Sequence, residues 1–173
     1  ASAETGKVLM WSGEDDPQDT LAPRLIASGA DMSRIFFVDH VKENGKSAAF
    51  DPAKHVAALS AAITAAGGAS LVIVDPVISA VSGDSHKASD TRRGLQPLVG
   101  MAMATRCAVI GITHFSKATE GRSPLDRVTG SQAYGALARV VFVAGKDETN
   151  VREGTAPRHV FLRAKSNIGP DQG

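Results

Sequence analysis

Three polar side chains in this sequence have the types and positions needed for phosphate chemistry: Glu14, Asp75 and His114. Each stands at or just past the end of an apolar run that reads as a β-strand. If the three strands are parallel neighbours, their carboxyl ends meet at one edge of a sheet, where open α/β proteins bind ligands. A carboxylate that orients water, one that holds Mg²⁺ and an imidazole that contacts phosphate would together form a phosphate-hydrolysis site.

Each of the three residues also has an ordinary explanation when it is considered alone. Glu14 would suit the first turn of a helix, where a negative charge is favourable. Asp75 would suit a turn after a strand, and His114 would suit a hydrogen-bonded structural position. Only the convergence of all three favours a site. The remaining histidines lack this context and are predicted to be structural or exposed: His40, His55, His86 and His159.

The strand that leads into Asp75 is the clearest element of the sequence. Residues 71–74 are Leu-Val-Ile-Val, and three of them are β-branched. A continuous apolar run of this kind is typical of a strand buried on both faces, as in a parallel sheet. Pro76 has no N–H to donate to a neighbouring strand, so the strand ends there. Asp75 is therefore predicted at the carboxyl end of a central strand.

The other elements follow from apolar periodicity and from cap and stop residues. Asp15 or Asp16 is expected to cap a helix whose first residue is Pro17. The predicted strands are residues 7–12, 35–39, 71–75, 107–113, 139–144 and 159–164. The predicted helices begin near Pro17, after Asp51-Pro52, after Asp90 and at Gly130, and they end near Gly29, Gly67-Gly68, residue 105 and Leu137. The predicted loops are residues 40–50, 79–90 and 115–129.

This order of elements predicts an α/β fold. Strands that alternate with helices form a mostly parallel sheet with right-handed crossovers. The fold class is therefore a RecA-like three-layer core, with a mostly parallel central sheet flanked by helices and a C-terminal antiparallel hairpin. No repeat or linker divides the sequence, so residues 1–173 are predicted to be a single domain.

Composition adds limits rather than a function. Apolar residues make up 43% of the chain, which suits an α/β protein. The net charge is only +1, so any contact with nucleic acid must come from a local patch of positive charge. The only cysteine, Cys107, lies in an apolar run and is predicted to be buried; a chain without internal disulfides fits a reducing, cytoplasmic setting. No apolar run reaches transmembrane length, and no signal-peptide pattern is present, so no membrane partner is expected.

A phosphate-binding loop of the form G-x-x-x-x-G-K-[ST] does not occur in the sequence. Gly6-Lys7 is followed by a predicted strand, whereas such a loop needs a helix N-terminus after it. Without that loop no row of backbone N–H groups holds the phosphates. These 173 residues by themselves are therefore expected to bind nucleotide weakly or not at all.

Several motifs together resemble the AAA_25 group, the RepA-like hexameric helicase ATPases of the RecA/DnaB-type P-loop NTPase superfamily. They are Ser12-Gly13-Glu14-Asp15-Asp16-Pro17, Leu71–Asp75, Thr113-His114-Phe115-Ser116-Lys117, Gly130-Ser131-Gln132-Ala133 with Ala138-Arg139, and Ala164-Lys165-Ser166-Asn167-Ile168-Gly169-Pro170. In that family a Walker A strand–loop–helix unit precedes the first motif. The resemblance therefore implies a fragment that lacks this unit at its N-terminus and stops short at its C-terminus.

The resemblance implies a role for each matching residue. Glu14 corresponds to the glutamate that polarises the attacking water, Asp75 to the Walker B aspartate that holds Mg²⁺, and His114 to the phosphate sensor. Arg139 and Lys165 occupy positions of basic residues that reach the γ-phosphate of a neighbouring subunit. DnaB-type relatives have an arginine where Asn167 stands, so this role falls to Arg139 or Lys165. A contact in trans implies a homo-oligomer, either a hexameric ring or a filament.

The loop of residues 115–129 carries three cations, Lys117, Arg122 and Arg127. In the family this region faces the central channel and contacts single-stranded DNA. Cations on a flexible loop are able to follow a phosphate backbone. A solvated, charged loop with no DNA contact explains the same residues equally well.

Three functions stay open at this point. The first is the ATPase core of a DNA helicase-type motor, which uses ATP and Mg²⁺ in the full-length parent and is inactive as this chain alone. The second is a degenerate RecA-like module with an assembly or regulatory role. The third is a KaiC-like signalling ATPase, which would use the same site without DNA.

Overall fold

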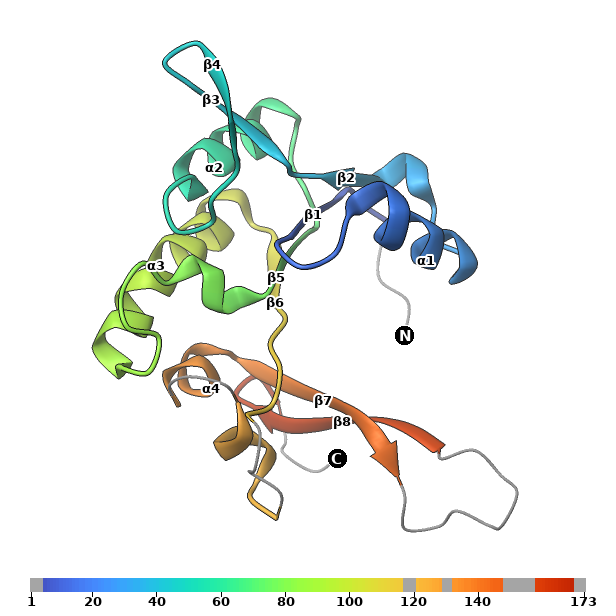
Figure 1. Ribbon diagram of the computed structural model, residues 1–173, viewed down its shortest axis with the longest axis vertical. Coiled ribbons are helices and arrows are strands. Elements are labelled where there is room, and N and C mark those ends of the chain that lie inside the picture. Colours follow the sequence, from blue (N-terminus) through green and yellow to red (C-terminus); the bar gives the residue numbers. More distant parts are fainter. Residues whose placement is uncertain (1–4, 117–120, 129–131, 148–157, 170–173) are drawn as a thin grey trace. The chain divides into compact units, whose positions relative to one another are not determined.

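The computed structural model describes residues 5–116, 121–128, 132–147 and 158–169 (Figure 1). The chain divides into two compact units, residues 1–114 and residues 115–173, and each is described by itself. No helix in the described ranges is long and apolar enough to cross a bilayer.

The first unit contains a four-stranded parallel sheet. Its strands are β1 (Val8–Ser12), β2 (Ile35–Phe37), β5 (Leu71–Asp75) and β6 (Ala108–Gly111), in the spatial order β2-β1-β5-β6. Every neighbouring pair is parallel. The predicted α/β fold with a parallel sheet is confirmed.

The connections reverse direction within this sheet. The chain passes from β1 outward to β2 and then crosses back over β1 to reach β5 and β6. Right-handed crossovers therefore place α1 (Ala22–Ala27) on one face and α2 (Val56–Ala65) and α3 (Ala88–Thr105) on the other, as Figure 1 shows. The reversal falls between β1 and β5, which makes the carboxyl ends of these two strands the topological switch point.

The core of the first unit lies around β5 and the two helices on the α2/α3 face. Val72 and Val74 of β5 and Ile63 of α2 are at most 2% exposed, and Leu95, Leu98 and Met101 of α3 are also buried. Leu71 and Ile73 are only half-buried. β5 is therefore fully buried on one face and partly buried on the other, whereas the sequence predicted burial on both faces. Cys107 is buried, as predicted.

Residues 40–50 were predicted to be a loop, and this prediction is wrong. They form an antiparallel hairpin of β3 (His40–Glu43) and β4 (Lys46–Ala49). Asn44 and Gly45 connect the strands with φ angles of 49° and 78°. A two-residue hairpin turn requires positive φ at both positions, and Asn-Gly is the sequence pair that adopts this conformation most readily.

The N-terminal helix is capped as predicted but begins differently. The Asp16 carboxylate accepts hydrogen bonds from the backbone N–H groups of Gln18 and Asp19, both at 2.8 Å. The first turn, Pro17–Leu21, is a π-helix that continues into α1. Gly29 has a φ of 78° directly after this helix, in agreement with the predicted stop.

Two other predicted helix starts need correction. Asp51 accepts a hydrogen bond from Ala53 N–H in a turn, and α2 starts five residues after Asp51, at Val56. Asp90 does not cap α3, because it lies in the first turn, where it pairs with Arg93. The predicted loop of residues 79–90 is shorter in the structure. A 3₁₀ helix at Val77–Ala80 includes its first two residues, and α3 includes its last three.

The second unit contains a short 3₁₀ helix (Pro124–Arg127) inside the predicted loop, the helix α4 (Ala133–Leu137) and a hairpin of β7 (Val140–Asp147) and β8 (Arg158–Ser166). The two strands pair antiparallel, with a register shift between Val141 and Phe142. This confirms the predicted C-terminal hairpin, which forms a sheet of its own in the described part of the chain.

Gly111 of β6 provides a test of the packing beneath the switch point. A Cβ on Gly111 would lie 2.7 Å from Val77 Cγ2 and 2.8 Å from Val77 Cβ. We expect Gly111→Ala to lower the free energy of unfolding in urea by about 1–3 kcal/mol through overpacking. Val77→Ala in the same chain should recover most of this loss.

Gly100 of α3 is the matched control, since a Cβ there meets nothing within 4 Å. Gly100→Ala should leave the stability unchanged or raise it by about 0.5–1 kcal/mol, because alanine favours a helix interior. Equal losses for the two glycine variants would contradict the packing described here.

Candidate active site

The turn after β1 fixes the backbone that carries Glu14. The Ser12 hydroxyl accepts hydrogen bonds from the backbone N–H groups of Glu14 at 3.3 Å and Asp15 at 3.0 Å. Gly13 N–H donates to the Asp75 carbonyl oxygen at 2.7 Å. Ser12 thus shapes the turn from within, while the Gly13 bond fastens it to β5.

Trp11 and Arg24 hold the same turn from outside. The Trp11 ring covers Gly13 so closely that a Cβ there would lie 2.8 Å from the Cη2 atom of the indole. Arg24 forms an ion pair with Asp15 at 2.9 Å. Both groups of this ion pair are substantially exposed, so the pair contributes little stability.

Asp75 reaches the same edge of the sheet through strand register. It pairs with Ser12 across β1 and β5, so the last residues of the two strands lie side by side. Its Oδ1 atom is buried and has no hydrogen-bond partner within the described residues. Burial raises the pKa of Asp75, and the nearby Glu14 carboxylate raises it further, while His114 acts in the opposite direction.

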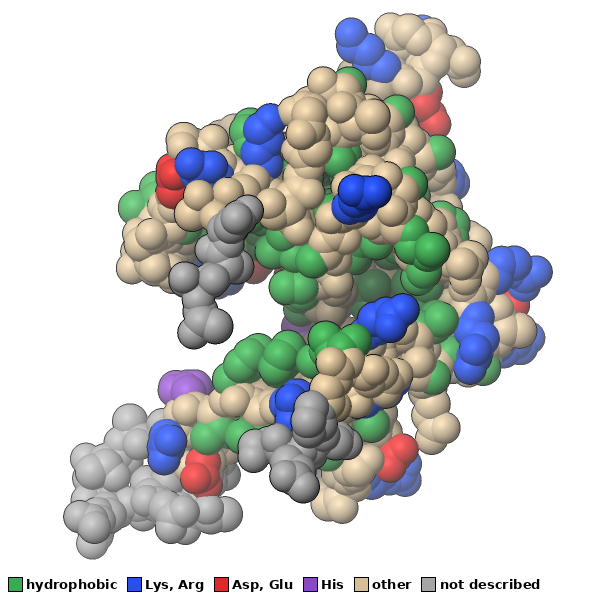
Figure 2. All heavy atoms as spheres, turned by 180° about the vertical axis from the view of Figure 1, so that it is seen from behind, with side chains coloured by type: hydrophobic (Ala, Val, Ile, Leu, Met, Phe, Trp, Pro, Cys, Tyr) green, Lys and Arg blue, Asp and Glu red, His purple; other side chains and the backbone are tan. Residues whose placement is uncertain are grey.

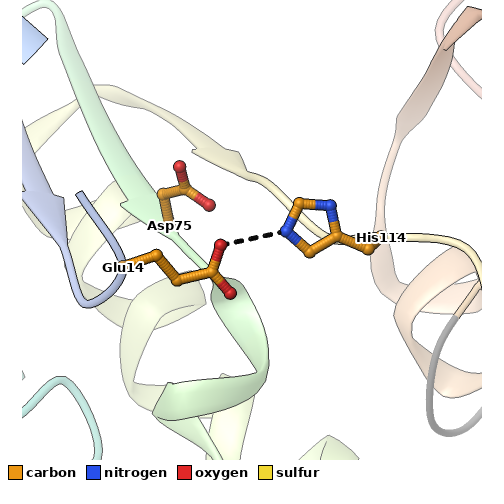
Figure 3. Close-up of side chains that lie close together, drawn as sticks. All are labelled: Glu14, Asp75 and His114. Carbon is orange, nitrogen blue, oxygen red and sulfur yellow. Dashed lines mark hydrogen bonds and ion pairs between the residues drawn. The ribbon is translucent and has the colours of Figure 1, made fainter. Parts of the chain in front are cut away.

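His114 arrives from the neighbouring strand β6. Ile112 N–H donates to the Val74 carbonyl at 2.9 Å, and Val77 N–H donates to the Ile112 carbonyl at 2.8 Å. These bonds hold the chain beyond β6 against β5 and its following turn. Nε2 of His114 then lies 3.1 Å from Oε2 of Glu14 (Figure 3).

The structure therefore brings Glu14, Asp75 and His114 together. One ligand atom from each residue lies within 4.8 Å of the others, and Figure 3 shows the three side chains directed toward a common point from three separate segments. Glu14 and His114 are exposed, whereas Asp75 is half-buried. The geometry supports the predicted cluster, and the chemical role of each residue stays a prediction.

The donor set suits a hard divalent cation. Mg²⁺ prefers carboxylate oxygens, and Asp75 offers one that is buried and unpartnered. A cation bound there would offset the repulsion between the Asp75 and Glu14 carboxylates, which is one cause of the raised pKa of Asp75. Asp75 is accordingly the residue best placed to hold Mg²⁺, and this role stays a prediction.

The two predicted trans contacts, Arg139 and Lys165, lie in the second unit and differ from each other. Nζ of Lys165 donates to the carbonyl oxygens of Gly135, Ala136 and Ala138 at 2.7, 3.3 and 2.9 Å, so it caps the C-terminal end of α4. Arg139 is exposed, and its backbone carbonyl accepts from Asn167 N–H at 2.8 Å.

The three predicted nucleic-acid contacts also belong to the second unit. Lys117 lies outside the described residues. Arg122 is exposed, but Arg127 stacks over the Phe115 ring at 4.2 Å from the ring centroid. Because Ser116 N–H also donates to the Arg127 carbonyl at 2.7 Å, Arg127 is held in place by local structure.

Sequence reasoning assigned no role to the Ser12 side chain, although it sets the position of Glu14. The signal was present: a serine two residues before an acid in a strand-end turn is able to accept backbone N–H bonds and form an ST-turn. The capping role of Lys165 had no such signal, because its partners lie about 30 residues earlier in the chain.

Comparison with known proteins agrees with this geometry. AAA_25, described as an AAA domain, matches residues 1–120. The chain belongs to the AAA_25 family. This confirms the family suggested by the motifs, and membership of a P-loop NTPase family implies nucleotide binding in general. No curated protein matches this AAA_25 chain.

Solved structures support the same fold. A KaiC-like protein from the hyperthermophilic archaeon Pyrococcus horikoshii OT3 has a TM-score of 0.57 and 16% identity, and the match covers 94% of this chain and 67% of that protein. The RadB recombinase has a TM-score of 0.57 and 18% identity, with 95% and 71% covered. At these identities the matches show that the AAA_25 chain has a RecA-like fold.

The raised pKa of Asp75 leads to a stability prediction. The folded state holds this proton more tightly than the unfolded state, so charged Asp75 costs stability above its raised pKa. The cost shrinks as the pH falls below that value and is gone below the ordinary pKa of the unfolded state. Asp75→Asn removes the charge and should raise the melting temperature at pH 7 without Mg²⁺. We expect less than about 1 kcal/mol, or roughly 2–4 °C at most, because the carboxyl is only partly buried.

Asp39→Asn is the control, since Asp39 also follows a strand but is exposed. This variant should have the same melting temperature as the unaltered chain in each of the scans. Thermal scans from acidic to neutral pH, with and without Mg²⁺, measure both effects. A lower melting temperature for Asp75→Asn would show that the Asp75 charge is compensated in the folded state.

Proposed function

We propose that this chain is the nucleotide-hydrolysing core of a DNA helicase-type motor, which couples ATP hydrolysis to binding of single-stranded DNA. The observation that carries the proposal is the convergence of Glu14, Asp75 and His114 at the switch point of the parallel sheet. Glu14 would orient and activate the attacking water, Asp75 would hold Mg²⁺, and His114 would contact the phosphate. Bound Mg²⁺ supplies charge neutralisation at the transferring phosphate.

The contact between Glu14 and His114 gives the site a means of responding to its ligand. Nε2 of His114 lies 3.1 Å from the Glu14 carboxylate. If the imidazole turned toward a phosphate oxygen, Glu14 would lose this partner and become available to a water molecule. Both side chains are exposed, so the contact is weak and its exchange costs little.

A phosphate-binding loop supplied from outside these 173 residues would fit next to β6. Within the described residues β6 pairs only with β5, so its other edge is open, and Ile110 on this apolar strand is 48% exposed. A further parallel strand on this edge would end beside His114. The loop after such a strand would face the cluster, so we expect the full-length product to supply a strand–loop–helix unit there.

A non-catalytic role is disfavoured by the Asp75 side chain. A buried carboxylate oxygen without a partner reduces stability, and burial raises the pKa of the group. An inert domain would gain stability if this residue were uncharged. Retention of the carboxylate beside a second one is expected where a cation must be held.

The test of Glu14 uses the full-length gene product with ATP and Mg²⁺. Glu14→Gln should lower turnover at least about 10²-fold, since the amide cannot accept a proton, and should leave nucleotide affinity within a few-fold. Glu43→Gln, on the β3–β4 hairpin, is the control and should retain turnover. Undiminished turnover of Glu14→Gln would remove Glu14 from the mechanism.

Single-stranded DNA separates the motor from the alternatives. A motor should show turnover that rises when DNA is added and binding that weakens steeply with salt. ATP turnover that does not change when DNA is added would support a KaiC-like signalling ATPase instead. Absence of both nucleotide binding and turnover in the full-length product would support a degenerate module.

Arg139 and Lys165 are separated by a second experiment. Lys165→Met should lower the free energy of unfolding by about 1–3 kcal/mol, because three carbonyl groups lose a charged donor. Arg139→Ala should leave stability nearly unchanged but abolish turnover if Arg139 acts in trans. Mixing Arg139→Ala subunits with Glu14→Gln subunits should then restore part of the activity, because some interfaces combine an intact Glu14 with an intact Arg139. No recovery on mixing would exclude the trans role.

A further inference from the structure

One face of the β7–β8 hairpin combines aromatic and basic side chains. Residues directly opposite in an antiparallel pair share a face, and alternate residues along a strand lie on that same face. Phe142 pairs with Arg163, Ala144 with Phe161, and Lys146 with His159. We name these residues the ribbon face. All six are exposed.

The two phenylalanines of the ribbon face stack on each other. Their ring centroids lie 4.9 Å apart with an interplanar angle of 17°, and the residues are 54% and 70% exposed. They are diagonal neighbours on the two strands, which is within reach of aromatic side chains. Apolar rings of this size are normally buried, so two that stack in the open form a platform for a further planar group.

The charge on the ribbon face has one sign. Lys146 and Arg163 are cationic, His159 adds an imidazole, and no Asp or Glu of the described residues of β7 and β8 shares this face. Asp147 pairs with Arg158 on the opposite face. The chain as a whole has a net charge of only +1, and the Lys and Arg side chains seen in Figure 2 are spread over the surface. A face with cations and without carboxylates is therefore a local feature.

We propose that the ribbon face binds single-stranded nucleic acid, with bases stacked on Phe142 and Phe161 and with Lys146 contacting the phosphates. Single-stranded nucleic acid is the ligand that offers both unstacked planar rings and a line of negative charge. A purely apolar protein partner would not match the positive charge of Lys146. The inference deepens the proposed motor function, since it assigns a strand contact outside the loop of residues 115–129.

The test measures binding of fluorescent oligothymidylate and oligouridylate to the unaltered chain and its variants by anisotropy, without nucleotide. Phe142→Leu and Phe161→Leu keep apolar bulk but remove the rings, and each should weaken binding about tenfold. The conservative changes Phe142→Tyr and Phe161→Tyr should retain binding. This pair of substitutions distinguishes loss of stacking from loss of folding.

Charge and specificity have their own controls. Lys146→Gln should reduce the slope of log affinity against log salt by about one. Phe36→Leu is the matched control, because Phe36 is an exposed phenylalanine of β2 in the first unit. It should leave binding unchanged.

The outcomes that overturn the inference are specific. Equal affinity for the phenylalanine-to-leucine variants and the unaltered chain would exclude stacking on the ribbon face. If the phenylalanine-to-leucine substitutions changed the sedimentation of the chain but not its oligonucleotide binding, the ribbon face would be a contact between copies of the chain. The binding assay needs no hydrolysis. Binding that depends on the phenyl rings of Phe142 and Phe161, in a full-length product without ATPase activity, would therefore uphold this inference and refute the proposed motor function.

Discussion

The parallel register between β1 and β5 is the constraint on which the candidate site depends. It sets Ser12 opposite Asp75, and the bond from Gly13 N–H to the Asp75 carbonyl extends the pairing by one residue. Glu14 is therefore carried on a turn that is attached to the strand bearing the second carboxylate. A slip of one residue would send Asp75 to the other face of the sheet and dissolve the cluster, whatever the side chains could otherwise do.

The same register creates an electrostatic cost. It places a half-buried carboxylate beside a second acid and leaves one oxygen without a partner, which is why the pKa of Asp75 is raised. The surrounding structure offsets this cost through the packing of β5, where Val72 and Val74 are at most 2% exposed. Because these valines are tightly packed, β5 cannot shift to give the Asp75 carboxylate a hydrogen-bond partner. The carboxylate is therefore kept in a position from which it could bind a ligand.

The sequence predicted the parts of this arrangement that depend on local chemistry. The apolar run before Asp75 and the Asp16–Pro17 cap are local signals, and the structure places them as expected. The strand before His114 is shorter than predicted, because β6 ends at Gly111 and His114 follows three residues later. Residues 40–50 were missed because their strands are polar and only Asn44-Gly45 marks the hairpin. The bonds made by Lys165 could not be predicted, because tertiary structure alone brings its ammonium group to the end of α4.

That capping role bears on which residue could act across a subunit interface. To reach a neighbouring phosphate, Lys165 would have to leave three carbonyl oxygens at the end of a five-residue helix, and the helix would lose its cap. Arg139 is exposed and, within the described residues, its side chain makes no hydrogen bond or ion pair that would have to break. Its backbone is nevertheless held by Asn167 at the start of the hairpin. A guanidinium group on a fixed backbone also offers paired donors to phosphate, which an ammonium does not, so Arg139 fits the proposed trans contact better than Lys165.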